Sequence, residues 1–307
     1  MSWRILITDG LAAEGLAALR AAAEVVEADE LGSLGAVDAL IVRSRTNVND
    51  VVLAAGAPRL KVVGRAGVGV DNIDLAGARA RGIVVVNAPM ATTIAVAEHT
   101  LALMLALARS IPQADASVRA GEWRKGAFQG IELEGKTLGL IGMGRIGAAL
   151  AERAASLGMR VLAYDPYLRE QEISHRHAQP SSLGDLLAQS DFVSLHVPLT
   201  ADTRGMLGSH ELAVIKPGAR IVCTARGGLI DETALVQALD DGRLAGAALD
   251  VFEVEPPGAN ALTTHPMVIC TPHIAAQTIE AQRRASVDIA AEVLAALKGG
   301  TLRWRVA

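Results

Sequence analysis

Residues 137–147 have the sequence TLGLIGMGRIG, in which a short apolar run ends in the pattern G-x-G-x-x-G formed by Gly142, Gly144 and Gly147. In a dinucleotide-binding βαβ unit the first glycine makes the tight turn, the second lets the backbone approach the pyrophosphate, and the third lets the helix pack on the strand. Residues 145–157 follow with the apolar periodicity of a helix. This stretch therefore predicts a strand, a glycine turn and a helix that bind a dinucleotide.

The acidic residue Asp165 indicates which dinucleotide binds. It ends a predicted strand at residues 160–164 and lies 18 residues beyond Gly147. A carboxylate at this place accepts hydrogen bonds from the adenosine ribose and repels a 2′-phosphate, which favours NAD over NADP. Arg169 is close enough in the sequence to weaken that preference.

The position of the glycine motif predicts two domains. Because the motif begins at residue 142, the chain ahead of it is long enough for a domain that holds the substrate. Apolar strand-like runs alternate with helix-like segments throughout, which is typical of an α/β protein with parallel sheets. The predicted strands are residues 4–8, 39–42, 60–63, 83–86, 160–164, 192–196, 219–224, 246–249 and 267–271, and the predicted helices are residues 12–23, 75–81, 93–109, 145–157 and 279–298.

Polar or glycine-rich clusters follow the carboxyl ends of five predicted strands. In an open doubly wound sheet these ends meet at one edge, and ligands bind in the crevice outside it. We therefore expect the clusters to surround a binding site. They are Asp165, His196-Val197-Pro198, Ala225-Arg226-Gly227-Gly228, Asp250 and Pro272-His273.

Arg226, Glu255 and His273 have the chemistry that oxidation of a 2-hydroxy acid requires. Arg226 can hold the substrate carboxylate because a guanidinium is planar and always charged. His273 can take the hydroxyl proton because the pKa of an imidazole lies near the working pH. A neighbouring carboxylate would orient the imidazole and favour its protonated form, and Glu255 is the candidate.

Several motifs in order along the chain resemble the D-isomer-specific 2-hydroxyacid dehydrogenase family, and within it the phosphoglycerate dehydrogenases most. They are GRAGVGVDNID at 64–74, GMGRIG at 142–147, ARGG followed by LIDE at 225–232, LDVFEVEPP at 249–257 and TPHIAAQT at 271–278. The likeness extends from about residue 4 to about residue 298. It implies an NAD-dependent enzyme that oxidises a D-2-hydroxy acid, with 3-phosphoglycerate and serine biosynthesis as the expected substrate and pathway.

The resemblance also implies roles for individual residues. Arg226 would anchor the substrate, His273 would act as general acid and base, and Glu255 would be its partner. The implied fold is a Rossmann-type doubly wound sheet for NAD at 93–274 and a flavodoxin-like α/β substrate domain at 1–92 and 275–307. The implied assembly is a homodimer formed through 93–130, or a higher homo-oligomer. The implied NAD contacts are Gly142, Gly144, Arg145, Ile146, Gly147, Asp165, His196, Val197, Pro198, Thr224, Ala225, Arg226, Asp250, His273, Ala275 and Ala276.

Residues of the first domain are expected to select the substrate. In the resembling family the loop at 65–69 offers backbone N–H groups to the substrate carboxylate, and a glycine-rich loop of this kind suits an anion. The implied contacts there are Arg65, Ala66, Gly67 and Val68. Arg43 and Arg65 match positions that carry basic residues facing the phosphate in phosphoglycerate dehydrogenases, so we expect them to form a phosphate clamp.

Composition limits the other classes of function. The chain has 307 residues, 51% of them hydrophobic, a net charge of −4, and no basic stripe, so we expect no nucleic acid partner. The longest apolar stretch is too short for a membrane span, the N-terminus has no signal-like apolar region, and two cysteines in apolar runs are expected to be buried and reduced. We therefore expect a cytoplasmic enzyme, with no metal site at His175 or His177.

Two alternatives remain open from the sequence. Within the same chemistry, the chain could be a hydroxypyruvate or glyoxylate reductase or another 2-hydroxyacid dehydrogenase. From another class, it could be an NAD-sensing scaffold of the corepressor kind. The sequence does not continue into the regulatory domains that many phosphoglycerate dehydrogenases append, so feedback control by serine is not expected.

Overall fold

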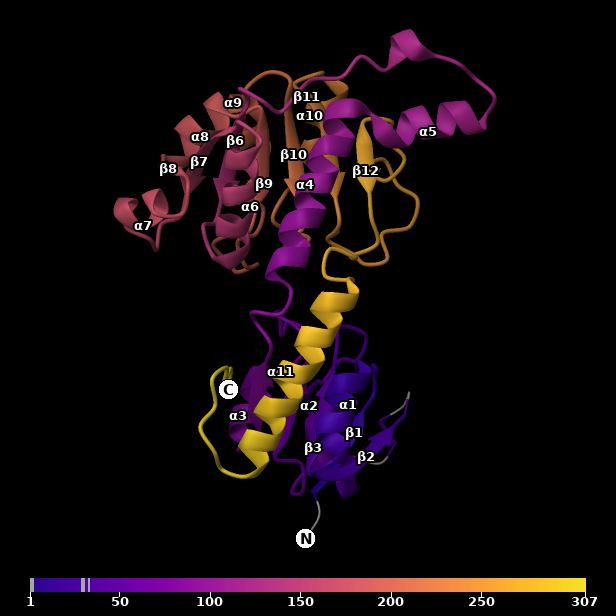
Figure 1. The fold of residues 1–307 in the computed structure, drawn as a ribbon, viewed down its shortest axis with the longest axis vertical. Helices are drawn as coiled ribbons and strands as arrows, with labels where there is room; N and C mark the ends of the chain where they lie inside the picture. The colour runs from indigo at the N-terminus through magenta and orange to yellow at the C-terminus, as the bar shows by residue number, and fades with distance from the viewer. Residues whose placement is uncertain (1–2, 29–30, 33) are drawn as a thin grey trace. The chain divides into compact units, whose positions relative to one another are not determined.

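The computed structural model describes residues 3–28, 31–32 and 34–307. The chain divides into a first unit, Met1–Thr93 with Ala276–Ala307, and a second unit, Ile94–Ala275. The expected domain boundaries lie one residue before these. Each unit contains one parallel sheet with helices on both faces (Figure 1), so the predicted α/β fold class is confirmed.

The first unit has a five-stranded sheet in the order β2-β1-β3-β4-β5, which is the flavodoxin-like order. Its strands are parallel, and β3 and β4 are buried on both faces except for Arg65 at the end of β4. The strands are β1 Trp3–Ile7, β2 Ala23–Glu27, β3 Ala39–Val42, β4 Val62–Arg65 and β5 Val84–Asn87. The edge strand β2 was not predicted.

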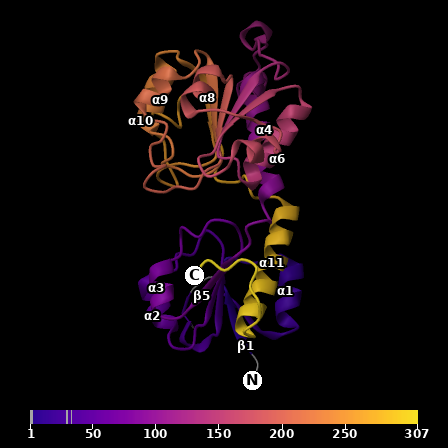
Figure 2. The same ribbon diagram turned by 90° about the vertical axis from the view of Figure 1, so that its left-hand side faces the viewer.

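Helices cover both faces of this sheet. Figure 2 shows α2 and α3 on one face and α1 and α11 on the other. Gly64 in β4 lets α11 approach closely, because a Cβ there would lie 2.6 Å from a methyl group of Val293. The helices are α1 Ala13–Arg20, α2 Asp50–Gly56, α3 Leu75–Ala80 and α11 Ile279–Leu297, with a short 3₁₀ turn at Leu34–Ala36.

The second unit has a seven-stranded parallel sheet in the order β12-β11-β10-β9-β6-β7-β8. The strand order reverses between β6 and β9, which is where open α/β sheets bind ligands. Because all seven strands run the same way, the predicted clusters do lie at one edge of the sheet. The strands are β6 Thr137–Ile141, β7 Arg160–Tyr164, β8 Gln179–Pro180, β9 Phe192–Leu195, β10 Ala219–Cys223, β11 Leu244–Leu249 and β12 Val268–Cys270.

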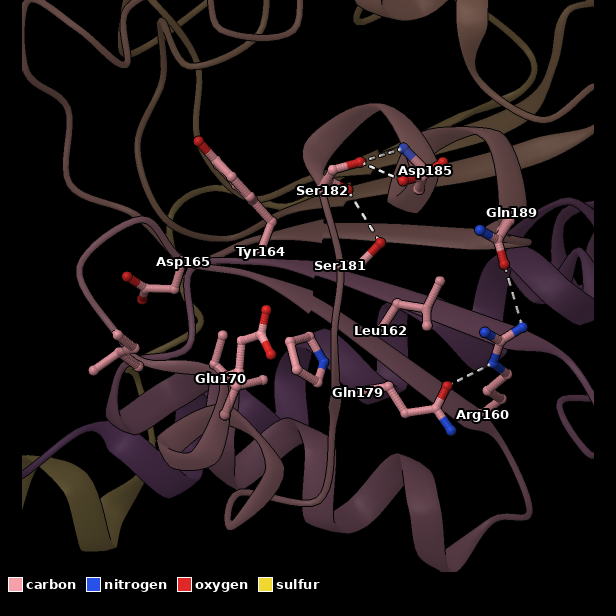
Figure 3. A pocket seen from close by; sticks show the side chains of 13 residues that line it. Arg160, Leu162, Tyr164, Asp165, Glu170, Gln179, Ser181, Ser182, Asp185 and Gln189 are labelled. Atoms are coloured by element: carbon pink, nitrogen blue, oxygen red, sulfur yellow. Dashed lines mark hydrogen bonds between the residues drawn. The ribbon is translucent and has the colours of Figure 1, made fainter.

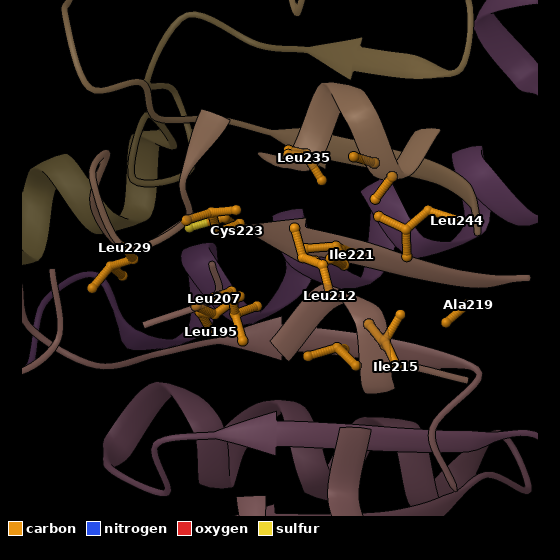
Figure 4. Close-up of a cluster of buried hydrophobic side chains, with 14 of the residues drawn as sticks. Leu195, Leu207, Leu212, Ile215, Ala219, Ile221, Cys223, Leu229, Leu235 and Leu244 are labelled. Carbon is orange, nitrogen blue, oxygen red and sulfur yellow. The ribbon is translucent and has the colours of Figure 1, made fainter. Parts of the chain in front are cut away.

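Two apolar layers hold this sheet between its helices. One layer joins it to α8, α9 and α10 (Figure 4), and the other joins it to α4 and α6. Phe192 is fully buried in the second layer. The helices are α4 Thr93–Arg109, α5 Ile111–Arg119, α6 Arg145–Ser156, α7 Glu170–Ser174, α8 Leu183–Gln189, α9 Ser209–Val214 and α10 Glu232–Asp240, with a 3₁₀ turn at Lys125–Ala127.

One expectation about the cysteines was wrong. Cys223 in β10 is buried, but Cys270 at the end of the edge strand β12 is exposed, and both thiols are free. Among the described helices none passes alone for a membrane span by length and hydropathy. The pair α4 and α5 passes only when taken together across a 62° bend.

Candidate active site

The glycine turn after β6 fits the backbone of a dinucleotide. Gly142 has φ of 96°, and a Cβ there would lie 2.7 Å from the carbonyl oxygen of His196. A Cβ on Gly147 would lie 2.3 Å from the oxygen of Gly142, so this glycine lets α6 pack against the turn. By contrast, a Cβ on Gly144 would meet no described atom within 4 Å. Gly144 is thus the glycine that faces open space, as approach to a pyrophosphate requires.

The N-terminus of α6 adds a site for the negative charge of a pyrophosphate. Gly144 is the N-cap of α6 and makes no side-chain cap, and Arg145 and Ile146 form the first turn. The first amides of a helix lack intrahelical acceptors and carry partial positive charge, so they bind phosphate groups well. Arg145 is exposed beside them.

Asp165 links the end of β7 to the glycine turn. Its Oδ2 accepts a 2.9 Å hydrogen bond from the amide of Met143, and its Oδ1 accepts one of 3.0 Å from the amide of Tyr167. The carboxylate is therefore held at the edge of the sheet, next to the glycine turn. A pocket of about 490 Å³ runs from Asp165 along β7 and β8 between α7 and α8 (Figure 3), beside the glycine turn rather than over it.

His196, Val197 and Pro198 follow β9 on the other side of the glycine turn. The amide of His196 donates to the carbonyl of Ile141 at 2.7 Å, which ties this segment to β6. Burial lowers the pKa of His196 from 6.5 to about 4, so its imidazole is neutral at neutral pH. Its Nε2 lies 3.0 Å from Oγ of Ser194.

Glu255 and His273 form a hydrogen-bonded pair that follows β11 and β12, the strands farthest from β7 and β8 in the sheet order. Nδ1 of His273 lies 2.8 Å from Oε2 of Glu255, and Oε1 of Glu255 accepts a 3.1 Å bond from the amide of Phe252. The carboxylate is an acceptor, so Nδ1 carries the hydrogen and Nε2 is free to take a proton. The imidazole is 46% exposed. His273 has φ of 54°, a conformation that non-glycine residues adopt rarely and mostly at functional sites.

Arg226 follows β10 on a loop that packs directly against the loop of Glu255. A Cβ on Gly227 would lie 1.8 Å from the carbonyl oxygen of Phe252, so only glycine allows this contact. Oε1 of Glu232 accepts a 2.7 Å bond from the amide of Glu253 and joins the two loops a second time. The Arg226 guanidinium is half-buried and donates to the carbonyl of Ala225 at 2.6 Å. The structure thus brings the loops of Arg226, Glu255 and His273 together.

Three expected cofactor residues face into the protein instead. Asp250 has no exposed surface, and its carboxylate accepts bonds of 2.8 Å from the amides of Ile274 and Ala275. Burial alone would raise the pKa of Asp250, but the hydrogen bonds from Thr271 and these amides and the nearby His99 outweigh it and hold the pKa below 3.8. Ala275 is buried with its amide engaged, and the hydroxyl of Thr224 pairs with Thr100 of α4 at 2.9 Å. In this structure these residues support the edge rather than line it.

In the first unit, Arg43 and Arg65 lie at neighbouring strand ends. Val42 pairs with Arg65 across β3 and β4, and Arg43 is the next residue along. Gly67 has φ of 157°, and a Cβ there would lie 1.5 Å from Nη1 of Arg65, so the guanidinium folds over this glycine. Ala276, also assigned to this unit, accepts a 2.9 Å bond from Gln282 through its carbonyl.

Fewer amides of the expected anion loop are available to a ligand than predicted. The amide of Ala66 donates to Val42, and the amide of Gly67 donates to the carbonyl of Arg65. These two N–H groups are therefore already used within the first unit. The amides of Val68 and Gly69 make no hydrogen bond among the described residues, and the side-chain amide of Asn87 donates a 2.7 Å bond to the carbonyl of Val68.

Asp9, which was not among the predicted site residues, organises the loop of Arg43. Its carboxylate is 3% exposed and accepts hydrogen bonds from the amide of Arg43 at 2.6 Å and from the hydroxyl of Thr46 at 2.6 Å. Asp9 follows a predicted strand directly, so the strand-end argument applied to the second sheet would have found it. Nη2 of Arg43 also donates to Oε1 of Gln277 at 3.2 Å.

Comparison with known proteins identifies the family. Residues 101–275 match the model of the D-isomer specific 2-hydroxyacid dehydrogenase, NAD binding domain, which is more than half of the chain and nearly all of the second unit. The chain belongs to this family. Its second unit is the family's NAD-binding domain, so the predictions of the family and of NAD as cofactor are confirmed.

Known proteins and solved structures resemble the chain over most of its length. It is 45% identical over 302 residues to the D-3-phosphoglycerate dehydrogenase of Bacillus subtilis (strain 168), covering 97% of this chain but 57% of that protein. Among solved structures, a protein of Thermus thermophilus has a TM-score of 0.89 at 37% identity, covering 99% of this chain and all of the other. A glyoxylate reductase of Paecilomyes thermophila has a TM-score of 0.90 at 33% identity, covering 99% and 98%.

Proposed function

We propose that this dehydrogenase oxidises D-3-phosphoglycerate to 3-phosphohydroxypyruvate with NAD, at the entry to serine biosynthesis. The observation that carries the proposal is the pair of Glu255 and His273 beside the loop of Arg226, at the same sheet edge as the glycine turn. The phosphoglycerate dehydrogenases that match this chain at 45% to 49% identity support the choice of substrate.

His273 is the proton acceptor in this proposal. Its Nε2 takes the proton of the C2 hydroxyl while Nδ1–H donates to Glu255, which stabilises the imidazolium that forms. When bound, NAD would supply the hydride acceptor that converts the alcohol at C2 to a ketone, and His273 keeps the proton. In the reverse direction the imidazolium returns its proton to the C2 oxygen.

Arg226 holds the substrate at the reacting carbon. Its guanidinium pairs with the carboxylate and with the oxygen at C2, where negative charge develops as the hydroxyl loses its proton. The contact of Gly227 with Phe252 keeps this loop in register with Glu255. Positioning of this kind accounts for a large part of the rate of a two-substrate reaction.

Residues of the first unit recognise the rest of the substrate. The amides of Val68 and Gly69 serve its carboxylate, and Arg43 and Arg65 serve its phosphate. Burial lowers the pKa of Arg43 while Asp9 opposes this change, but a guanidinium stays charged in proteins. Two fixed cations at neighbouring strand ends favour a doubly charged phosphate over a neutral hydroxyl group.

The cofactor is NAD rather than NADP in this proposal. Gly142, Gly144 and Gly147 with the first turn of α6 hold the pyrophosphate, and Asp165 accepts the adenosine ribose hydroxyls. His196, Val197 and Pro198 close the other side of the nucleotide. The carboxylate of Asp165 repels a 2′-phosphate, since its position is fixed by two backbone amides.

The active form is proposed to be a homodimer, built through α4, α5 and the segment that follows them. Apolar side chains are exposed along this region of the second unit, including Leu105, Ile111, Val118 and Trp123, the last of which is 85% exposed. An apolar surface of this kind is typical of a protein interface. The two free thiols are consistent with a reducing compartment, and we propose the cytoplasm.

A substrate panel tests the proposal. Reduction of nicotinamide is followed by absorbance with D-3-phosphoglycerate, D-glycerate, D-lactate and glycolate, each with NAD and with NADP. The proposal predicts the highest kcat/KM for phosphoglycerate with NAD, and loss of that preference in Arg43→Gln and Arg65→Gln. Faster turnover of the unphosphorylated acids, glycolate included, would instead favour another 2-hydroxyacid dehydrogenase. NAD binding that changes the oligomeric state without any turnover would favour the scaffold.

A further inference from the structure

His99 lies in the middle of α4 and reaches the turn that carries His273. Its position in the middle of a predicted helix indicated no role in the site. Its Nε2 is 3.2 Å from the hydroxyl oxygen of Thr271 and 3.6 Å from Oδ1 of Asp250, and its side chain is 20% exposed.

The hydrogen bonds run in one direction through these residues. The hydroxyl of Thr271 donates to Oδ1 of Asp250 at 2.5 Å, so its hydrogen is used. Thr271 can then only accept from His99, which fixes the hydrogen of His99 on Nε2. The chain of donors is therefore His99 to Thr271 to Asp250. The last member, the carboxylate of Asp250, has no exposed surface, so the loss of any hydrogen-bond donor to it would cost free energy.

Asp250 in turn holds the backbone of the His273 turn. Its two oxygens accept from the amides of Ile274 and Ala275, the residues directly after His273. His273 itself has a positive φ of 54°, and a conformation of this kind persists only where the surroundings impose it. The donors behind Asp250 therefore bear on the placement of the His273 imidazole.

Thr100, the next residue of α4, supports the loop of Arg226. The hydroxyl of Thr100 donates to the carbonyl of Val96 at 2.8 Å and accepts from Thr224 at 2.9 Å. Thr224 is two residues before Arg226. Consecutive side chains of one helix thus support the two loops that hold the candidate base and the candidate carboxylate anchor.

We propose that His99 is a positioning residue, which fixes the imidazole of His273 through Thr271 and Asp250. The inference rests on the proposed function, in that His273 must act on the substrate for its placement to matter to turnover. It assigns α4 a part in the reaction besides its packing against the sheet.

Two substitutions separate this role from simple packing. His99→Gln keeps an N–H donor on a side chain of similar reach, whereas His99→Leu keeps the bulk and removes the donor. We expect His99→Leu to lower kcat at least tenfold with little change in KM or in the Kd of NAD, and His99→Gln to recover most of it. Glu98→Gln is the matched control, because Glu98 is 60% exposed and pairs with Arg153 on α6; its kcat should equal that of the wild type.

NMR of the His273 ring gives a readout that does not depend on turnover. The ring resonances should shift in His99→Leu and stay near wild-type positions in His99→Gln. Wild-type kcat and unshifted resonances in a folded His99→Leu would overturn the proposal, as would equal impairment of both variants. If His99→Leu does not fold, Thr271→Val and Thr271→Ser test the same chain, with Ser alone retaining kcat. A wild-type protein without turnover, with the resonances behaving as expected, would count against the proposed function and not against this inference.

Discussion

Nδ1 of His273 lies 2.8 Å from Oε2 of Glu255, although the two residues come from different loops 18 positions apart. The loop of Glu255 follows β11, and His273 follows β12, the neighbouring strand. The pair depends on packing between loops, since Gly227 and Glu232 hold the Glu255 loop from the side of Arg226. The contacts that position the loop of Arg226 therefore also hold Glu255, and through it His273.

Replacing Glu255 by Gln should lower kcat by about 10²-fold or more, because the imidazolium loses its stabilising charge and its fixed tautomer. The Kd of NAD should stay within about twofold of the wild type, since the glycine turn is untouched. Steady-state kinetics and a fluorescence titration with NADH measure the two quantities. Unchanged kcat would show that Glu255 does not assist His273.

Gly227→Ala should disrupt the contact between the two loops. Its Cβ would lie 1.8 Å from the oxygen of Phe252, so the backbone must move, at a cost of about 1 to 3 kcal/mol in stability and about 10²-fold in kcat. Gly184→Ala in α8 is the matched control. A Cβ at Gly184 meets no described atom within 4 Å, and Ala in a helix stabilises by up to about 1 kcal/mol. Equal melting temperatures and kcat in both variants would contradict this account of the loops.

Gly144→Ala should separate folding from cofactor binding. A Cβ at Gly144 meets no described atom within 4 Å, and its φ of −70° suits alanine, so the melting temperature should not fall. The methyl group would occupy the space that the pyrophosphate needs, and the Kd of NAD should rise at least about tenfold. Calorimetric titration with NAD measures it. An unchanged Kd would mean that the nucleotide binds elsewhere.

His196 should make stability depend on pH in a defined window. Its pKa is about 4 in the folded state and 6.5 ordinarily, so protonation favours the unfolded chain. The contribution of the neutral His196 ring to the free energy of unfolding is complete above pH 6.5 and is lost as the pH falls towards about 4. At about pH 5 the loss amounts to about 2 kcal/mol.

Urea unfolding at about pH 7 and about pH 5 tests this, with His196→Gln as the comparison. The variant should lose less stability between the two pH values than the wild type. The carboxylates of Asp9 and Asp250 have pKa values held below 3.8, so their contributions are lost at lower pH and do not blur the result. An equal loss of unfolding free energy between the two pH values in both proteins would contradict the burial of the His196 ring.

The sequence predicted the elements whose pattern is local. The strand at Arg160–Tyr164 and the helix at Thr93–Arg109 have the predicted bounds, because a buried parallel strand is apolar throughout and a long helix keeps one period. The strand Ala23–Glu27 was missed because it lies at a sheet edge and no residue in it is fully buried. The exposure of Cys270 has the same cause, since β12 is also an edge strand.

The sequence predicted those site residues that come soon after the end of a strand. Arg226 and His273 were found in that way, and the structure brings their loops together through Gly227 and Asp250. The inward orientation of Asp250 and the bond of His99 to Thr271 were not predictable, since both depend on how α4 packs across the sheet. Periodicity assigns a histidine to a helix but does not tell which strand end it reaches.

The most direct test of the account compares wild-type protein with His273→Gln in NAD reduction by D-3-phosphoglycerate. We expect measurable turnover in the wild type and a loss of at least about 10³-fold in kcat for the variant, with the Kd of NAD unchanged. Gln retains a polar side chain but cannot accept the hydroxyl proton at neutral pH. A folded His273→Gln protein that turns over phosphoglycerate at the wild-type rate would contradict the assignment of His273 as the proton acceptor.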